Sequence, residues 1–449
     1  MKALTSYLRL AARRLLLTGL AGLAAAAHAG SQLPCSAPRV FQGAVLNSFV
    51  LPFRYVGNQP TPELLRASRQ ISALVHFEIL FGLLKYGAVG GTDLVAVPGQ
   101  VCDVDTVIGQ VTRGAGPGSL QPGKALVVTW GRLFEQGDEL YVQTYLRFLR
   151  QGQTGPARET IGVPLSGDGT RLDLTANLPA QAIAFPARRI SRKDLERIGA
   201  EFRLAMVVRP KKDMNVEGQS IDFAPEQVFP YGVTRAEGDW MWIEPMAGGP
   251  RGWVRARTGA DGQPGEWSLQ RWMPELAYVD AVAGFMRLRA DAGLGAAPRE
   301  RTRAAIDEGL QRFEQAVGTD DAPAAYGLAR AMRGFMGWDG QPDQRAQAAS
   351  LFAEARTRMP EYAAARNLAA VTRPLRSGAA LDAKVTARMA RELNAALALD
   401  PGDRTVLDNM ERVYKVYTLR RDWSPVDAAV VAQRLATVQA TRARAPAAD

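Results

Sequence analysis

A tryptophan-rich segment, residues 238–256, separates two unlike parts of this chain of 449 residues. Five of the eight tryptophans lie between Trp240 and Trp272. Before this segment, stretches with the two-residue alternation of strands mix with stretches of helical spacing. From Met273 onward only the helical spacing is found. The sequence therefore predicts a multidomain α+β protein whose C-terminal part is all-α.

The tryptophan-rich segment itself has the pattern of two short strands. Residues 239–243 and 252–256 each alternate large apolar side chains with others, as strands do. The intervening Gly248-Gly249-Pro250 favours a turn, because glycine accepts positive φ and proline fixes its own φ. Two strands, a glycine-rich turn and an aromatic face are typical of a hairpin in a small β-barrel.

The pattern G-D-W-x-W-I followed by G-G-x-x-G-W-V resembles bacterial Src-homology-3-like domains over about residues 204–257. The resemblance implies a small β-barrel that binds peptides or peptidoglycan stems. Alternate strand residues share a face, so the tryptophans form either the barrel core or a partner-binding groove. An arginine beside a tryptophan either binds a carboxylate or stacks on its neighbour. The candidate ligand-binding residues are Trp240, Trp242, Arg251, Trp253, Arg255 and Trp267.

The first 29 residues have the composition of a secretory signal peptide. Residues 1–14 carry four basic residues and no acidic one, and residues 15–27 form an apolar run. Ala27-His28-Ala29 then offers a small-x-small cleavage site. No later stretch reaches 18 uninterrupted apolar residues, so we expect no transmembrane segment. The sequence thus predicts a periplasmic protein cleaved near Ala29.

Two cysteines, Cys35 and Cys102, follow the signal peptide. An even pair in an exported chain favours a disulfide bond. A lipidated Cys35 is the competing interpretation. It is disfavoured because Pro34 precedes the cysteine, where a lipidation signal needs a small residue.

The N-terminal part alternates predicted strands and helices. We expect a strand over 43–54, a helix from Pro62 to about Lys85, a strand over 92–97, a short helix over 104–111, and a hairpin over 124–149. This order of strands and helices, together with V-L-P-F-R at 50–54 and the hairpin sequence at 123–146, resembles that of the amino-terminal α/β domain of TolB and related outer-membrane assembly proteins. The resemblance implies the fold of this domain and leaves its function open.

A β-rich extension follows the hairpin. Residues 158–165 and 171–176 are expected strands, and Ser191 is expected to cap a helix that continues to about Phe202. The predicted domains are the signal peptide (1–29), an α/β domain with this extension (30–190), the Src-homology-3-like barrel with its leading helix (191–272), helical repeats (273–440) and a flexible tail (441–449).

The C-terminal part repeats a two-helix pattern at a period near 40. The segments beginning at Phe313, Phe352 and Leu393 align, and a short break and a second helical stretch follow each of them. The sequence A-L-A-L-D-P-G-D at 396–403 resembles the end of a tetratricopeptide repeat, although the consensus tryptophan and glycine are missing. The resemblance implies stacked helical hairpins with a concave binding surface.

Residues that could carry out catalysis are scarce. The only histidine after residue 29 is His76, which lies in an apolar helical stretch and is expected to be buried. No phosphate-binding glycine motif and no Cys/His zinc pattern is found, so no cofactor or metal is expected. Removing residues 1–29 lowers the formal net charge from +10 to +6, with no basic stripe, which makes nucleic acid an unexpected partner.

These features predict a non-enzymatic periplasmic adaptor of the cell envelope. Its helical repeats and tryptophan-rich barrel would hold envelope proteins or peptidoglycan. The alternative is a cell-wall glycan hydrolase that works through a carboxylate such as Asp239 or Glu244, which flank the W-x-W step.

Overall fold

The computed structural model describes residues 40–444 with gaps at 42–43, 45, 58–59, 86–89, 95–103, 113–124, 138, 151–157, 168, 179–181, 206, 221–230, 238–239, 246–248, 256–268, 291–292, 319–321, 340–341 and 378–379. The predicted signal peptide, Cys35, Cys102, Asp239 and Trp267 lie outside the described residues. Of the helices that it describes, none has both the length and the apolar character needed to cross a membrane.

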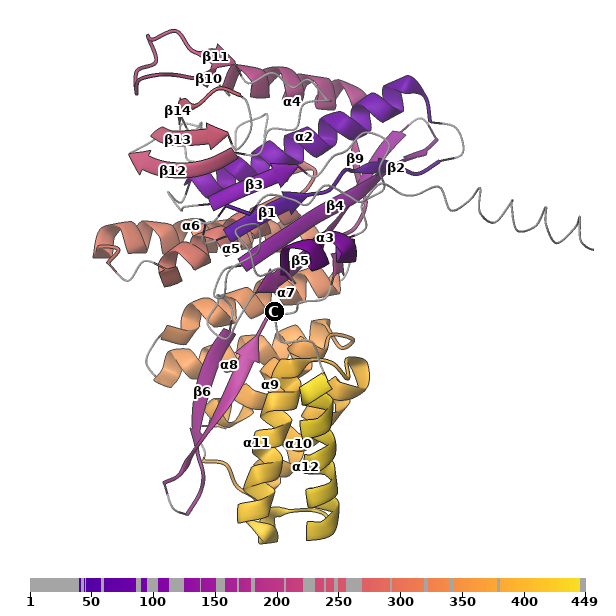
Figure 1. The fold of residues 1–449 in the computed structure, drawn as a ribbon, viewed down its shortest axis with the longest axis vertical. Coiled ribbons are helices and arrows are strands. Elements are labelled where there is room, and N and C mark those ends of the chain that lie inside the picture. The colour runs from indigo at the N-terminus through magenta and orange to yellow at the C-terminus, as the bar shows by residue number, and fades with distance from the viewer. Residues whose placement is uncertain are drawn as a thin grey trace, which may run out of the picture.

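The chain forms a mixed α+β structure with a central sheet above a region of helices (Figure 1). Strand β1 (Leu46–Val50) lies in the middle of the sheet, between β3 (Gly90–Leu94) and β4 (Ala125–Gln136), and is parallel to both. All five β1 residues are buried, as expected of a central strand that is covered on both faces, and two of them, Asn47 and Ser48, are polar. Strand β2 (Arg54–Tyr55) pairs with the far end of β4.

One helix covers each face of this central part. Helix α2 (Pro62–Lys85) connects β1 and β2 to β3 and packs its buried side chains against one face. Its Ser72 hydroxyl accepts a hydrogen bond of 2.8 Å from the Phe53 N–H, which fixes the bend after β1. Helix α3 (Val104–Thr112) packs on the other face, against Phe49 and Leu51. Both helices agree with the predicted ranges.

The predicted hairpin is confirmed. Strands β4 and β5 (Glu139–Arg150) are antiparallel over twelve residues each, and Gly137 at the turn has a φ of 64°. The short strands β8 (Ile183–Ala184) and β9 (Arg188–Ile190) pair with β5. The predicted helix after Ser191 is α4 (Arg192–Ala205), and the Ser191 hydroxyl caps it by accepting from the Asp194 N–H at 3.0 Å.

The tryptophan strands do not form a separate barrel. Strands β12 (Tyr231–Glu237), β13 (Trp240–Pro245) and β14 (Gly252–Arg255) form an antiparallel meander whose first strand pairs with β3. The central sheet therefore has ten strands, and the strands described for residues 204–257 close no barrel. The expectation of a closed barrel was wrong, because β12 pairs with the edge of β3 that β1 leaves unpaired and so extends the central sheet. The small sheet of β10 (Val207–Val208) and β11 (Gln219–Ser220) lies beside β14.

Helices follow from Glu275 onward, as predicted. They are α5 (Glu275–Ala290), α6 (Ala296–Val317), α7 (Pro323–Met336), α8 (Pro342–Arg358), α9 (Ala363–Ser377), α10 (Ala383–Leu399), α11 (Arg404–Leu419) and α12 (Ala428–Arg444). The predicted two-helix units correspond to α6–α7, α8–α9 and α10–α11, and each helix packs against the next. Helix α12 continues to Arg444, so residues 441–444 are helical although the sequence predicts a flexible tail there.

The sheet and the helices share one continuous hydrophobic core. A chain of aromatic rings marks the junction. Phe148 of β5 lies 5.6 Å from Tyr278 of α5, Tyr278 lies 5.4 Å from Phe313 of α6, and Phe313 lies 5.9 Å from Phe185 after β8, all measured between ring centroids. Burial of these rings holds α5 and α6 against the sheet.

The β-rich extension makes a second junction, which the sequence did not reveal. Strands β6 (Arg158–Pro164) and β7 (Arg171–Asn177) form a hairpin that leaves the main sheet and lies along α9 and α11 (Figure 1). The end of β6 is also fixed, because the Leu381 N–H donates to the Pro164 carbonyl at 2.8 Å. The hairpin therefore connects the N-terminal part to the helices.

Two buried asparagines hold β7 on the helices. The Thr175 N–H donates to Asn409 Oδ1 at 2.7 Å, and Asn409 Nδ2 donates back to the Thr175 carbonyl at 2.7 Å. Asn367 Nδ2 donates to the same carbonyl at 2.9 Å, and its own Oδ1 accepts from Asn409 Nδ2 at 2.8 Å. Both asparagines have no exposed surface. Their amides thus satisfy backbone groups that an adjacent strand would otherwise pair.

Candidate functional site: a tryptophan face on the sheet

The candidate ligand-binding residues of β13 and β14 lie on one face of the sheet. In the strand register, Trp240 is opposite Arg255 and Trp242 is opposite Trp253. Opposite residues point to the same side, and residues two apart in a strand do so as well. The four side chains therefore share one face. The rings of Trp242 and Trp253 meet edge to face, with centroids 5.4 Å apart.

The opposite face of the same strands belongs to the core. Ile243 and Val254 have no exposed surface and join the main hydrophobic core. Trp240 and Trp242 are half-buried, and Trp253 is 8% exposed. The W-x-W step thus places its tryptophans on the side opposite to the buried side chain of Ile243.

Residues from neighbouring segments complete this face. Lys212, in the loop after β10, places its Nζ 5.0 Å from the centre of the Trp253 ring, as in a cation–π contact. The same ammonium forms an ion pair with Glu237, which lies opposite Trp240 in β12. The Trp242 indole N–H donates to Glu244 Oε1 at 2.8 Å. We call this set of residues the Trp face: Trp240, Trp242, Trp253, Arg255, Lys212, Glu237 and Glu244.

The loop that carries Lys212 is fixed to β14 through the backbone. Arg209 and Trp253 exchange two hydrogen bonds, of 2.8 and 2.7 Å. Gly252 permits this approach, because a Cβ at that position would lie 2.5 Å from the Arg209 carbonyl oxygen. The glycine of the G-W-V motif is therefore needed for the contact that brings Lys212 over Trp253.

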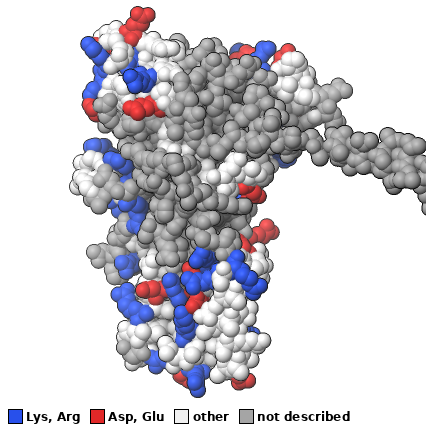
Figure 2. Space-filling model, viewed as in Figure 1, with Lys and Arg blue, Asp and Glu red and all other residues white. Residues whose placement is uncertain are grey.

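The Trp face combines aromatic surface with charges of both signs. Arg255 and Glu244 are exposed beside the half-buried tryptophans, and Arg251 is exposed just before β14. Figure 2 shows acidic and basic residues intermixed at this end of the molecule. Such a surface can bind a ligand with apolar groups and charged ends, such as a peptide.

The structure adds two residues to the predicted set. Lys212 and Glu237 were not predicted, because neither lies in the W-x-W or G-W-V motif and only the sheet register places them next to Trp253 and Trp240. Trp272, which the sequence grouped with the other tryptophans, packs partly buried against the main core.

Of the residues with catalytic chemistry, Glu244 belongs to the Trp face, whereas His76 and Glu275 are buried and are not part of it. His76 is 2% exposed in α2, as the sequence predicted for a core residue. Glu275 is 2% exposed, and burial raises the pKa of its carboxyl to about 7, opposed by the Thr144 hydroxyl and by Arg188. A buried carboxyl of this kind has no access to a polymer substrate. In the described part of the chain, no group of three His, Cys, Asp or Glu side chains could hold a metal ion.

Comparison with family models, with curated proteins and with solved structures finds no match to this chain.

Proposed function

We propose that this chain is a non-enzymatic periplasmic adaptor of the cell envelope, and that the Trp face is its partner-binding site. The observation that carries the proposal is the half-burial of Trp240 and Trp242 on the side of the sheet that faces away from the core. Aromatic side chains that are partly exposed beside charged groups have the composition of interface hot spots. The ligand would be a protein segment or a peptidoglycan stem peptide.

We further propose that the strands around the Trp face bind peptides in the manner of Src-homology-3-like domains, within the larger sheet. The pairing of β14 with both β13 and Arg209 supports this, because it places Trp253 between two other backbone segments. For the C-terminal part we propose a tetratricopeptide-like solenoid. Its support is the succession of packed helix pairs α6–α7, α8–α9 and α10–α11.

The helical part already binds one extended segment, its own β7. Asn367 and Asn409 bind the backbone of Thr175, and the helices also donate to the side chains of Thr175 and Asn177. The inner surface along α9 and α11 is therefore taken by the hairpin. This supports placing the partner at the Trp face and not on the surface of α9 and α11 that β7 covers.

The test compares alanine variants on the two faces of β13. We expect Trp242→Ala to weaken co-sedimentation with purified peptidoglycan sacculi by about thirtyfold, which corresponds to about 2 kcal/mol for an aromatic hot spot. Its melting temperature should fall only slightly. Ile243→Ala, in the core, should lose about 2–5 kcal/mol of stability and retain binding while folded. Leu419→Ala, at a side chain 78% exposed on α11, is the control for both readouts.

Binding that is lost only together with the fold would contradict the proposal. The hydrolase alternative is tested in the same samples. Asp239→Asn and Glu244→Gln change the two carboxylates that this alternative names. An adaptor would release no soluble fragments from sacculi with or without these changes, whereas a hydrolase would release fragments in the wild type and lose that release in one of these variants.

A further inference from the structure

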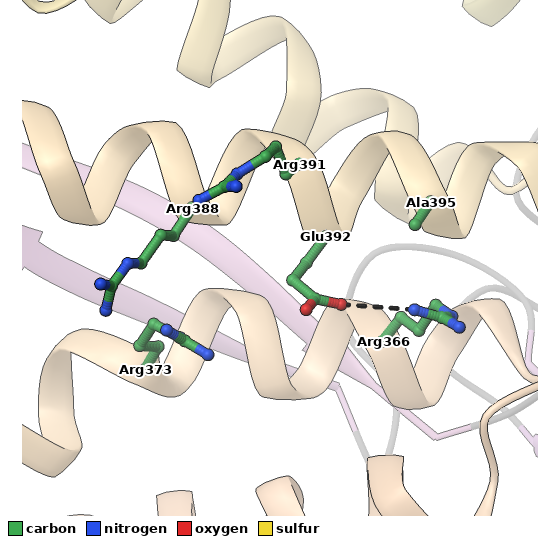
Figure 3. Close-up of a pocket in the computed structure, with 6 residues that line it drawn as sticks. All are labelled: Arg366, Arg373, Arg388, Arg391, Glu392 and Ala395. Atoms are coloured by element: carbon green, nitrogen blue, oxygen red, sulfur yellow. Dashed lines mark hydrogen bonds and ion pairs between the residues drawn. The ribbon is translucent and has the colours of Figure 1, made fainter.

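A groove between α9 and α10 concentrates arginines. It is a cavity of about 400 Å³ lined by Arg366, Arg373, Arg388, Arg391, Glu392 and Ala395 (Figure 3). The two arginines of α9 are seven residues apart, and those of α10 are three apart, so each pair lies along one side of its helix. We call this cavity the Arg groove.

The carboxylate of Glu392, in the lining of the Arg groove, is already neutralised. Glu392 Oε1 accepts from Arg356 Nη2 at 2.8 Å, and its Oε2 accepts from Arg366 Nη1 at 3.4 Å (Figure 3). Among the described residues, no hydrogen bond or ion pair involves the guanidinium groups of Arg373, Arg388 or Arg391. The lining of the Arg groove thus carries four guanidinium groups and one carboxylate, and three of the four guanidinium groups have no ion pair among the described residues.

This arrangement differs from that of other arginines in the helical part. Arg330 pairs with Glu314 and Glu354, and Arg333 pairs with Asp307 and Glu314. Unpaired like charges on adjacent helix turns are destabilising. A cavity that brings arginines without ion pairs together has the electrostatics of an anion site. Figure 2 shows that basic residues also outnumber acidic ones over much of the helical part on the face in view.

The length of the Arg groove selects the class of anion. Its lining extends from Arg366 to Arg373, two helical turns or about 10 Å along α9, which is longer than one phosphate or carboxylate group. Glu392 shows that a carboxylate can lie between two guanidinium groups here. We propose that the Arg groove binds an acidic peptide segment, whose carboxylates would pair with Arg373, Arg388 and Arg391. The proposal does not depend on the Trp face, which shares no residue with the Arg groove.

The test measures binding of a fluorescent eight-residue peptide of alternating Glu and Ser to the full exported chain by anisotropy. We expect binding that weakens as salt rises from about 50 to 500 mM. The triple variant Arg373→Gln, Arg388→Gln, Arg391→Gln should lose about tenfold or more in affinity, because each exposed pair contributes a factor of about two to five. The matched control, Arg345→Gln with Arg421→Gln and Arg434→Gln, removes three exposed arginines outside the Arg groove.

Equal losses in the two triple variants, or no binding to the wild type, would overturn the proposal. Competition by inorganic phosphate or pyrophosphate at concentrations below those of the peptide would also overturn it, since the site would then select phosphate groups. Melting of both variants verifies that neither has unfolded. An intact Trp face can be verified separately by sacculus binding, so failure at one site is distinguishable from failure at the other.

Discussion

Replacement of Asn409 by alanine should release the β6–β7 hairpin from the helices. The variant loses the acceptor of the Thr175 N–H, the donor to the Thr175 carbonyl, and the donor to Asn367 Oδ1. Thr175 is only 3% exposed, so water cannot replace these bonds without local opening. A buried group left unsatisfied costs about 1–3 kcal/mol, and at least two such groups result. We expect a loss of about 3 kcal/mol in the free energy of unfolding.

Two measurements test this loss. Urea unfolding gives the change in stability, and hydrogen exchange over residues 171–177 reports local opening of the hairpin. The control Asn394→Ala, at an exposed position of α10, should change stability by no more than about 0.5 kcal/mol. The double variant with Asn367→Ala should be less destabilised than the sum of the single variants, because the two amides bond to each other. Equal stability and equal exchange in Asn409→Ala and Asn394→Ala would refute the role assigned to the asparagines.

Three further predictions follow from buried contacts and from the sequence. Burial raises the pKa of Glu275 from 4.5 to about 7, so its contribution to stability, about 3 kcal/mol in total, is fully present below pH 4.5 and is lost as the pH rises to about 7. Glu275→Gln should reduce the pH dependence of the urea midpoint over this range. An unchanged pH dependence would contradict this prediction. Gly82→Ala places a Cβ against the buried Asp280 carboxylate, which Gln270 holds by a hydrogen bond, and should cost about 1–3 kcal/mol. Gly309→Ala, whose Cβ meets nothing closer than 3.6 Å, should be neutral or stabilising in the same melts. Mass spectrometry of the exported protein should find a chain that begins near Gly30 with Cys35 joined to Cys102, and two free thiols would contradict the bond.

Local patterns in the sequence predicted most of the elements. The helix from Pro62, the twelve-residue hairpin and the helix pairs all follow from periodicity and capping residues. The capping serine Ser191 was identified from the acidic residue three positions later. These features depend on residues that are close in the sequence, and for that reason they could be predicted.

The features that could not be predicted from the sequence depend on contacts between distant segments. The pairing of Tyr231 with Thr92 joins strands about 140 residues apart, and no local pattern distinguishes such an extension of the sheet from a separate barrel. The contact of Asn409 with Thr175 spans 234 residues. Part of the Trp face was predictable, because alternation placed Trp240 and Trp242 on one side. Lys212 was not, since its position depends on the backbone contact between Arg209 and Trp253.

Photo-crosslinking in the intact envelope tests most directly whether the Trp face binds a partner. A photoreactive phenylalanine analogue replaces Trp240 on the Trp face, and in a second strain it replaces Leu419, an exposed apolar residue of α11. We expect a defined crosslinked product, containing a single protein or peptidoglycan, when the analogue is at position 240. We expect no such product when it is at position 419. The same product should disappear when Trp242→Ala is added to the first strain. Identical products from both positions, or a product from 419 alone, would contradict the account.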